Sequence, residues 1–269
     1  MRTLALVLRA ARQSRLQLVG CALLLAGFQF VLVAQAAVFQ ESQAFGRIAE
    51  FMPSFLQRGL GPQALLLASF RGIIAFGYFH PLVVVLIAVL GAYFATEPAY
   101  DVETGRVDLL LARSVPRHRV ITRSLLLALL AIVVTLAFMA LGTWAGLRVY
   151  APGQAGSPSF ATIGRLILHL AALGSVFAAF ALAVGAGASR WTPAFTTVVI
   201  TAVLLYWIDF LAVAWPRMRA LAWMSPFGYY PALGILAGTA PRWSNVLVLW
   251  SAGAVLVALA YWRFQRRDL

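Results

Sequence analysis

Long apolar stretches alternate with short polar ones along the chain, and six of them meet or approach the length needed to cross a lipid bilayer. They cover residues 16–39, 72–96, 124–147, 166–189, 191–215 and 246–262. A helix needs about 20 mostly apolar residues to cross the hydrocarbon core, because each residue advances it by about 1.5 Å. None of the stretches shows the period of two that a membrane β-barrel requires. Since a backbone in lipid must satisfy its own hydrogen bonds, the pattern predicts an all-α polytopic membrane protein with six transmembrane helices.

A seventh stretch, residues 221–240, carries no charge but is interrupted by proline and glycine. Pro226 and Pro231 lack the N–H that a helix interior needs, and three glycines further weaken helical order. We expect a re-entrant or broken segment here, within an outer loop that covers residues 216–244 and precedes the last helix. Residues 59–70 are too short to span and are expected at the membrane surface.

The first 15 residues predict a separate amphipathic helix. At about 100° per residue, its arginines fall on one side and its apolar residues on the other. The arginines are Arg2, Arg9, Arg12 and Arg15, and the apolar residues are Leu4, Val7 and Ala11. Such a helix lies flat on a membrane, with its guanidinium groups at anionic headgroups. The apolar run that follows is longer than the core of a secretory signal, so we expect an uncleaved anchor.

The composition indicates a membrane protein and excludes several kinds of catalytic site. Of the 269 residues, 62% are hydrophobic and 11% are charged, against about 25% charged residues in soluble domains. The net charge of +13 is spread between the apolar runs and forms no single basic face, so no nucleic acid is expected as a partner. All 21 basic residues are arginine, which excludes a Walker A, Schiff-base or kinase-type lysine. Any use of ATP is therefore expected on a partner protein.

The connection between the second and third predicted helices, residues 97–123, concentrates the polar side chains. It holds four of the eight acids of the chain, Glu97, Asp101, Glu103 and Asp108, followed by several arginines. Most arginines lie inside if both termini are cytoplasmic, which the positive-inside rule favours. This orientation also places the connection in the cytoplasm.

Within this connection, Gly105 predicts a break before a short helix over residues 106–113. Val107, Leu110 and Leu111 share an apolar face of that helix, and charges of both signs flank it. A connection that only turned the chain around would be shorter. An apolar ridge with such flanks is typical of a docking surface for a cytoplasmic protein, and a solvated loop is the alternative interpretation.

At these residues the chain resembles the permease subunits of the ABC-2 class of ABC exporters. The matching motifs are Glu103-Thr104-Gly105, Leu110-Leu111-Ala112 and Pro116-Arg117 in the connection, Trp223-Met224-Ser225-Pro226-Phe227 in the broken segment, and Phe264-Gln265-Arg266-Arg267-Asp268 near the end. Arg123 stands where that class often has a lysine. The six spans, the amphipathic first helix and the broken segment also look like that class. The resemblance implies a single transmembrane permease domain over residues 1–269.

The resemblance further implies that two permease subunits, either two copies or a copy and a paralogue, form a translocation path in the plasma (inner) membrane of a bacterium or archaeon. Each would be driven by a separate ATP-binding cassette subunit, which binds the ATP and Mg, while this chain binds no cofactor. The residues that would couple to that subunit are Glu97, Asp101, Glu103, Gly105, Arg106, Asp108, Leu110, Leu111, Arg113 and Arg117.

Three ionisable side chains lie inside the predicted spans, apart from Cys21 and the tyrosines: His80, His169 and Asp209. Each falls in the outer half of its span. Because such groups are costly in lipid, they are candidates for a transport path or gate, or for hydrogen bonds between helices. Their spacing does not support a metal site, and none is expected. They would be the polar centre if the protein were an intramembrane lipid-modifying enzyme; a non-transporting membrane scaffold is the other alternative function.

Overall fold

The computed structural model describes residues 2–42, 66–67, 69–112, 116–153, 156–239 and 243–267. Within these ranges the elements are helices, and no strand is present. In chain order they are α1 (Arg2–Gln13), α2 (Arg15–Glu41), α6 (Phe70–Phe79), α7 (Pro81–Ala95), α8 (Glu97–Glu103), α9 (Arg106–Ala112), α10 (Arg117–Tyr150), α11 (Phe160–Gly187), α12 (Trp191–Ala214), the 3-10 helices η1 (Pro216–Met224) and η2 (Pro226–Tyr229), α13 (Ala232–Leu236) and α14 (Trp243–Gln265).

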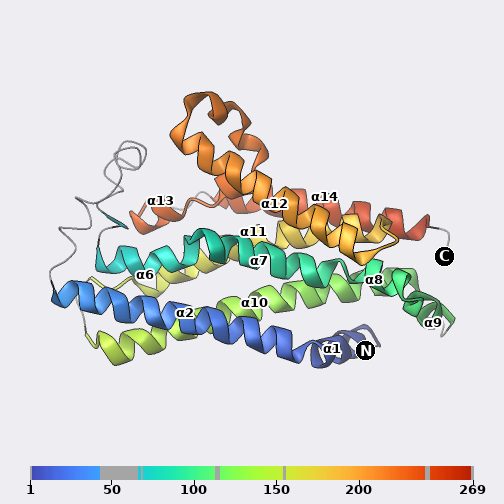
Figure 1. Cartoon of the computed structure of the whole chain (residues 1–269), viewed down its shortest axis with the longest axis horizontal. Helices are drawn as coiled ribbons and strands as arrows, with labels where there is room; N and C mark the ends of the chain where they lie inside the picture. The colour runs from blue at the N-terminus through green and yellow to red at the C-terminus, as the bar shows by residue number, and fades with distance from the viewer. Residues whose placement is uncertain are drawn as a thin grey trace.

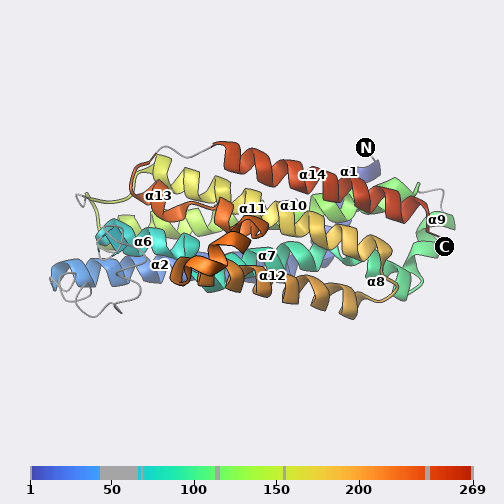
Figure 2. The same cartoon turned by 90° about the horizontal axis from the view of Figure 1, so that it is seen from above.

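Six helical segments in the described ranges are long and apolar enough to cross a membrane. They are Arg15–Glu41, Phe70–Glu103, Arg117–Tyr150, Phe160–Gly187, Trp191–Ala212 and Trp243–Gln265. They extend along the long axis of the molecule (Figures 1 and 2), and each predicted stretch falls on one of them. The prediction of an all-α polytopic membrane protein is confirmed.

Both ends of the chain lie at the end of the bundle where α8 and α9 lie (Figure 1). We call this the α8–α9 end, and we call the opposite end of the bundle the distal end.

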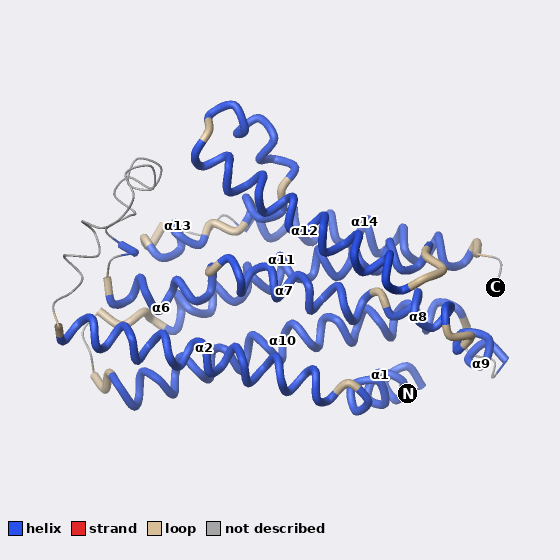
Figure 3. The backbone as a smooth tube through the Cα atoms, viewed as in Figure 1, coloured by secondary structure: helices blue, strands red, loops and turns tan. Residues whose placement is uncertain are grey.

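The second span is not one continuous helix, which the sequence analysis did not predict: it breaks at His80, between α6 and α7 (Figure 3). His80 has φ −55° and ψ 130°, the extended conformation favoured before a proline, here Pro81. The Leu82 N–H donates to Nδ1 of His80 at 3.2 Å rather than to the carbonyl of Tyr78. That carbonyl accepts a hydrogen bond from the Tyr230 hydroxyl at 3.1 Å. A residue distant in sequence therefore satisfies the backbone that the break exposes.

Helix α11 lies at the centre of the bundle (Figure 2) and contacts α7, α10, α12 and α14. Glycines allow some of these contacts to be close. A Cβ on Gly174 would come within 2.8 Å of Ile87 on α7, and one on Gly185 within 3.0 Å of Thr96. Helices in lipid associate through such small residues, because burial of apolar surface gives little driving force there.

The broken segment before the last span is confirmed within residues 216–239, whereas residues 240–242 lie outside the described part. Here η1 and η2 each have a proline in the first turn, and α13 has only five residues. Ser225, between the two 3-10 helices, donates from its hydroxyl to the Leu205 carbonyl of α12 at 3.0 Å. Helix η1 and the end of α12 project from the bundle (Figure 1). The expectation for residues 59–70 falls mostly outside the described residues.

Helix α1 is a separate helix, as predicted, and joins α2 at Ser14. Val7 and Ala10 are buried, and α1 contacts α10. Leu4 and Leu8 remain exposed. The apolar side is thus divided between the protein and its surroundings, so the position of α1 on a membrane surface stays a prediction that this exposure favours.

Candidate functional site

Helix α8 extends the second span and carries three of the predicted acids. Its first turn contains Pro98, where the missing N–H removes no helical hydrogen bond. It ends where the Thr104 N–H donates to the Tyr100 carbonyl at 3.0 Å, and Gly105 follows with a φ of 67°. Positive φ is unfavourable for residues with a Cβ, so a glycine is suited to this turn. The predicted break at Gly105 and the short helix after it, α9, are confirmed.

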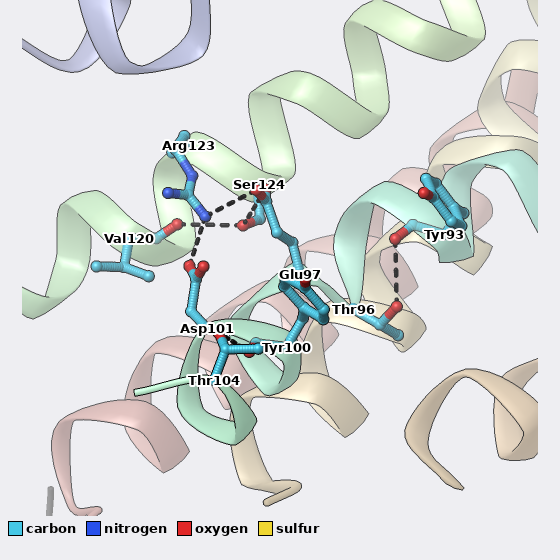
Figure 4. Close-up of polar contacts among 9 residues, drawn as sticks. All are labelled: Tyr93, Thr96, Glu97, Tyr100, Asp101, Thr104, Val120, Arg123 and Ser124. Atoms are coloured by element: carbon cyan, nitrogen blue, oxygen red, sulfur yellow. Dashed lines mark hydrogen bonds and ion pairs between the residues drawn. The ribbon is translucent and has the colours of Figure 1, made fainter. Parts of the chain in front are cut away.

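Arg123 on α10 lies between two carboxylates of α8 (Figure 4). Its Nη2 is 2.6 Å from Oδ2 of Asp101 and 3.1 Å from Oε1 of Glu97. The Ser124 hydroxyl donates a longer hydrogen bond, 3.4 Å, to the other oxygen of Glu97. The exposed fractions of the side chains are 9% for Arg123, 3% for Asp101 and 26% for Glu97. These contacts join α8 to α10, and removing one member would leave the others as uncompensated buried charges.

A cavity of about 330 Å³ opens beside this ion group. Two carboxylates and one guanidinium leave an excess of negative charge, and two further arginines line the cavity, Arg9 from α1 and Arg106 from α9. The guanidinium of Arg106 also lies over the ring of Tyr100, 5.1 Å from its centroid. We call the junction of α1, α8, α9 and α10 around Glu97, Asp101 and Arg123 the charged junction.

Glu103 connects α8 to α12, the fifth span. Its Oε2 accepts a hydrogen bond from the backbone N–H of Trp191, the first residue of α12, at 2.8 Å. The N-cap residue of α12, Arg190, makes no side-chain capping bond. A carboxylate at this position satisfies a free N–H and interacts favourably with the positive end of the helix dipole. Glu103 therefore caps a helix of its own chain.

Arginines at this end also bind the carboxyl ends of helices. Arg117 donates from Nη1 to the carbonyls of Gln265 at 3.1 Å and Arg267 at 2.6 Å, which joins α10 to the end of α14. Arg267 donates to the carbonyls of Ala186 at 3.3 Å and Ala188 at 2.8 Å, at the end of α11. Positive charge is favourable at helix C-termini, where carbonyls lack helical partners.

One residue of the apolar face predicted for α9, Val107, does not lie at the surface. Val107 is buried in the core and cannot contact a partner, whereas Leu109, which the apolar pattern did not select, is 69% exposed beside the exposed Asp108. Leu110 and Leu111 lie on α9, but their side chains are outside the described part, as is all of Arg113.

Sequence reasoning missed the role of Arg123, which it noted only for its place in the family pattern. A signal was present: Glu97 and Asp101 follow the second apolar stretch, and Arg123 comes directly before the third. The end of one span and the start of the next lie at the same end of a helical bundle, so opposite charges at these positions favour pairing.

The three ionisable residues of the spans lie toward the distal end but do not form one site. Nδ1 of His169 lies 2.8 Å from the Arg165 carbonyl on its own helix, and its buried Nε2 has no partner in the described structure. The His80 ring packs edge-on against Phe28 and Phe76. Asp209 borders a separate cavity. No three His, Cys, Asp or Glu side chains of the described residues gather as metal ligands would.

Comparison with known proteins relates this chain to multidrug efflux permeases. Residues 3–265 match the family described as "Multidrug efflux system permease Rv1217c, C-terminal domain". One curated relative, the multidrug efflux system permease protein Rv1217c of Mycobacterium tuberculosis, is 34% identical over 224 residues. The alignment covers 82% of this chain and 37% of the relative, so the chain spans little more than a third of the protein it matches.

Proposed function

Because the chain belongs to the family of the Rv1217c multidrug efflux permease C-terminal domain, we propose that it is the membrane subunit of an ABC-2 type exporter driven by a separate ATP-binding cassette subunit. Family membership and six spans make it a multi-pass membrane permease component. The absence of lysine supports placing ATP and Mg on the partner, with no cofactor on this chain. The efflux description of the family supports export rather than import.

The observation that carries the coupling proposal is the way α9 is tied to the spans. Helix α9 lies between α8 and α10 in sequence. Helix α8 is bound to α10 through Arg123 and to α12 through Glu103. Arg117 in turn binds α10 to α14. A force applied to α9 by a partner therefore reaches three spans through paired charges and helix caps. Packed helices respond as rigid bodies, so closure of the partner on ATP would tilt these spans together.

We place the contact itself on the exposed face of α9, where Asp108 and Leu109 lie, with Arg106, Leu110, Leu111 and Arg113 as further contact residues. Glu97, Asp101, Glu103 and Arg117 act behind this face, as the links to the spans. Gly105 allows α9 to leave the direction of α8.

The translocation path is proposed to form between two permease domains, supplied by a second copy of this chain or a paralogue. The arginine distribution favours cytoplasmic termini, and the resemblance to ABC-2 permeases favours the plasma (inner) membrane of a bacterium or archaeon. The α8–α9 end then faces the cytoplasm, as docking of an ATP-binding subunit requires.

The test is affinity isolation of the chain from native membranes in mild detergent, followed by mass identification of the proteins that accompany it. We expect an ATP-binding subunit without membrane spans. Asp108→Arg should reduce both its recovery and its stimulated ATPase activity several-fold, because the variant reverses an exposed charge on α9. Glu41→Arg makes the same change at the exposed distal end of α2 and should alter neither. Equal recovery and ATPase activity in both variants would remove α9 as the docking helix.

A further inference from the structure

A second cavity, of about 450 Å³, lies toward the distal end between α12, the η2–α13 segment and the break in the second span. Its lining includes four aromatic side chains and one carboxylate. They are Phe79, Tyr206, Phe227, Tyr230 and Asp209. The volume is within the range of small-molecule sites, about 300–1,000 Å³.

The aromatic rings are held in place by contacts within the protein. Phe227 is buried and packs edge-to-face against Tyr206, with ring centroids 5.4 Å apart, and its ring lies tilted against that of Phe177, with centroids 5.1 Å apart. Tyr230 donates its hydroxyl to the carbonyl that the helix break leaves free at Tyr78. Burial, and then the neighbouring Tyr78, raises the pKa of Tyr230 well above its usual value, so this hydroxyl stays protonated. The cavity is preformed.

Asp209 has no cation beside it in the described part of the chain. The ion pairs found there all belong to Arg123, at the other end of the bundle, and no hydrogen bond to the Asp209 carboxylate is present among the described residues. A Cβ on Gly228 would come within 3.1 Å of Oδ1 of Asp209, so the glycine keeps space open beside the carboxylate. An unpaired carboxylate within a span is costly, and such groups are usually functional.

We propose that this cavity binds a lipophilic organic cation, with Asp209 as its counter-ion and the aromatic rings as its apolar walls. The inference rests on the proposed function, for which it names a class of transported substrate. A cation placed there gains Coulomb attraction to the carboxylate and interacts with the negative faces of the rings. A neutral compound of the same shape lacks both terms, and an anion is repelled.

Two probes of nearly identical shape and opposite charge, tetraphenylphosphonium and tetraphenylborate, test the charge selectivity. Binding is measured on the full chain in lipid nanodiscs without an ATP-binding subunit, and binding to empty nanodiscs is subtracted. With each probe measured alone, we expect saturable binding of tetraphenylphosphonium and no saturable binding of tetraphenylborate. Asp209→Asn should weaken binding of the cation by about tenfold or more, because it removes the charge term. Asp209→Glu should keep the affinity within about threefold, since it keeps the charge.

Two control variants separate the site from general effects. Glu41→Gln removes an exposed carboxylate at the end of α2, to which no role is assigned, and should leave cation binding unchanged. Tyr206→Leu should weaken binding several-fold while Tyr206→Phe, which keeps the ring, should not. All variants must elute as a single species on size exclusion.

Unchanged cation affinity in Asp209→Asn, or equal binding of the two probes, overturns the proposal. If Asp209→Asn does not fold, the comparison of the two probes on the unaltered chain still tests the charge selectivity of the site. Because no ATP-binding subunit is present, failure here leaves the coupling proposal standing, and failure to recover that subunit leaves the cation site standing.

Discussion

At the α8–α9 end, each carboxylate of α8 has a partner: Glu97 and Asp101 lie against Arg123, and Glu103 accepts the first N–H of α12. At the distal end, Asp209 lies beside aromatic rings with no cation in the described structure. Charges that are paired within the protein fix helices relative to one another. A carboxylate without an internal partner leaves a place for a charge from outside. The same residue type thus serves mechanical coupling at one end and, in our proposal, ligand selection at the other.

The largest effect is expected from Arg123→Met, which leaves two carboxylates without a cation at the charged junction. We expect a loss of about 3–5 kcal/mol in the free energy of unfolding, because stranded buried charges are costly. Thermal unfolding of the detergent-solubilised chain, followed by size exclusion, measures it. The triple variant Glu97→Gln, Asp101→Asn, Arg123→Met should recover much of the loss, since no charge is left unpaired.

Arg148→Met is the control for this prediction, because Arg148 is exposed near the distal end and lies over the Trp144 ring at 5.2 Å. It should change stability by about 1 kcal/mol or less. Equal stability of the two single variants would mean that the charged junction does not hold α8 to α10.

At the distal end, Tyr230→Phe removes the hydroxyl that satisfies the free carbonyl at the break in the second span. The expected cost is about 1–2 kcal/mol, since a buried carbonyl loses its donor. Tyr229→Phe removes only a long, exposed hydrogen bond of 3.4 Å to Trp223 and is the matched control. A Tyr230→Phe chain that melts at the same temperature as the Tyr229→Phe chain would show that the break does not need this bond.

The smallest effect is expected from Glu103→Gln, which keeps a hydrogen-bond acceptor but removes the charge that caps α12. We expect a loss of about 0.5–1 kcal/mol, typical of a charge at a helix N-terminus. Because so small a change is local, hydrogen exchange at the first amides of α12 is the sensitive measurement. Glu41→Gln, on α2, should leave these amides unchanged, and faster exchange in both variants would argue against a specific cap.

Much of the candidate site could be predicted from the sequence. Gly105 marked a turn and the acids of residues 97–123 marked an important connection, and both lie at the described junction. The pairing of Arg123 could not be assigned, because it depends on how α8 and α10 are set against each other. The cap that Glu103 provides depends on α12, 88 residues further along the chain. The face of α9 was misjudged at Val107, since periodicity cannot say which apolar side chain turns inward.

The sequence alone determined that the chain is a bundle of six membrane-spanning helices, because apolar length and backbone hydrogen bonding in lipid permit few other solutions. It also indicated the broken segment, since proline and glycine act locally. The break at His80 had a local signal in Pro81, but only the tertiary structure decided that Tyr230 satisfies the carbonyl freed there, and that Asp209 faces aromatic rings rather than a cation. These outcomes depend on the packing of helices that are distant in sequence, which the local sequence pattern does not determine.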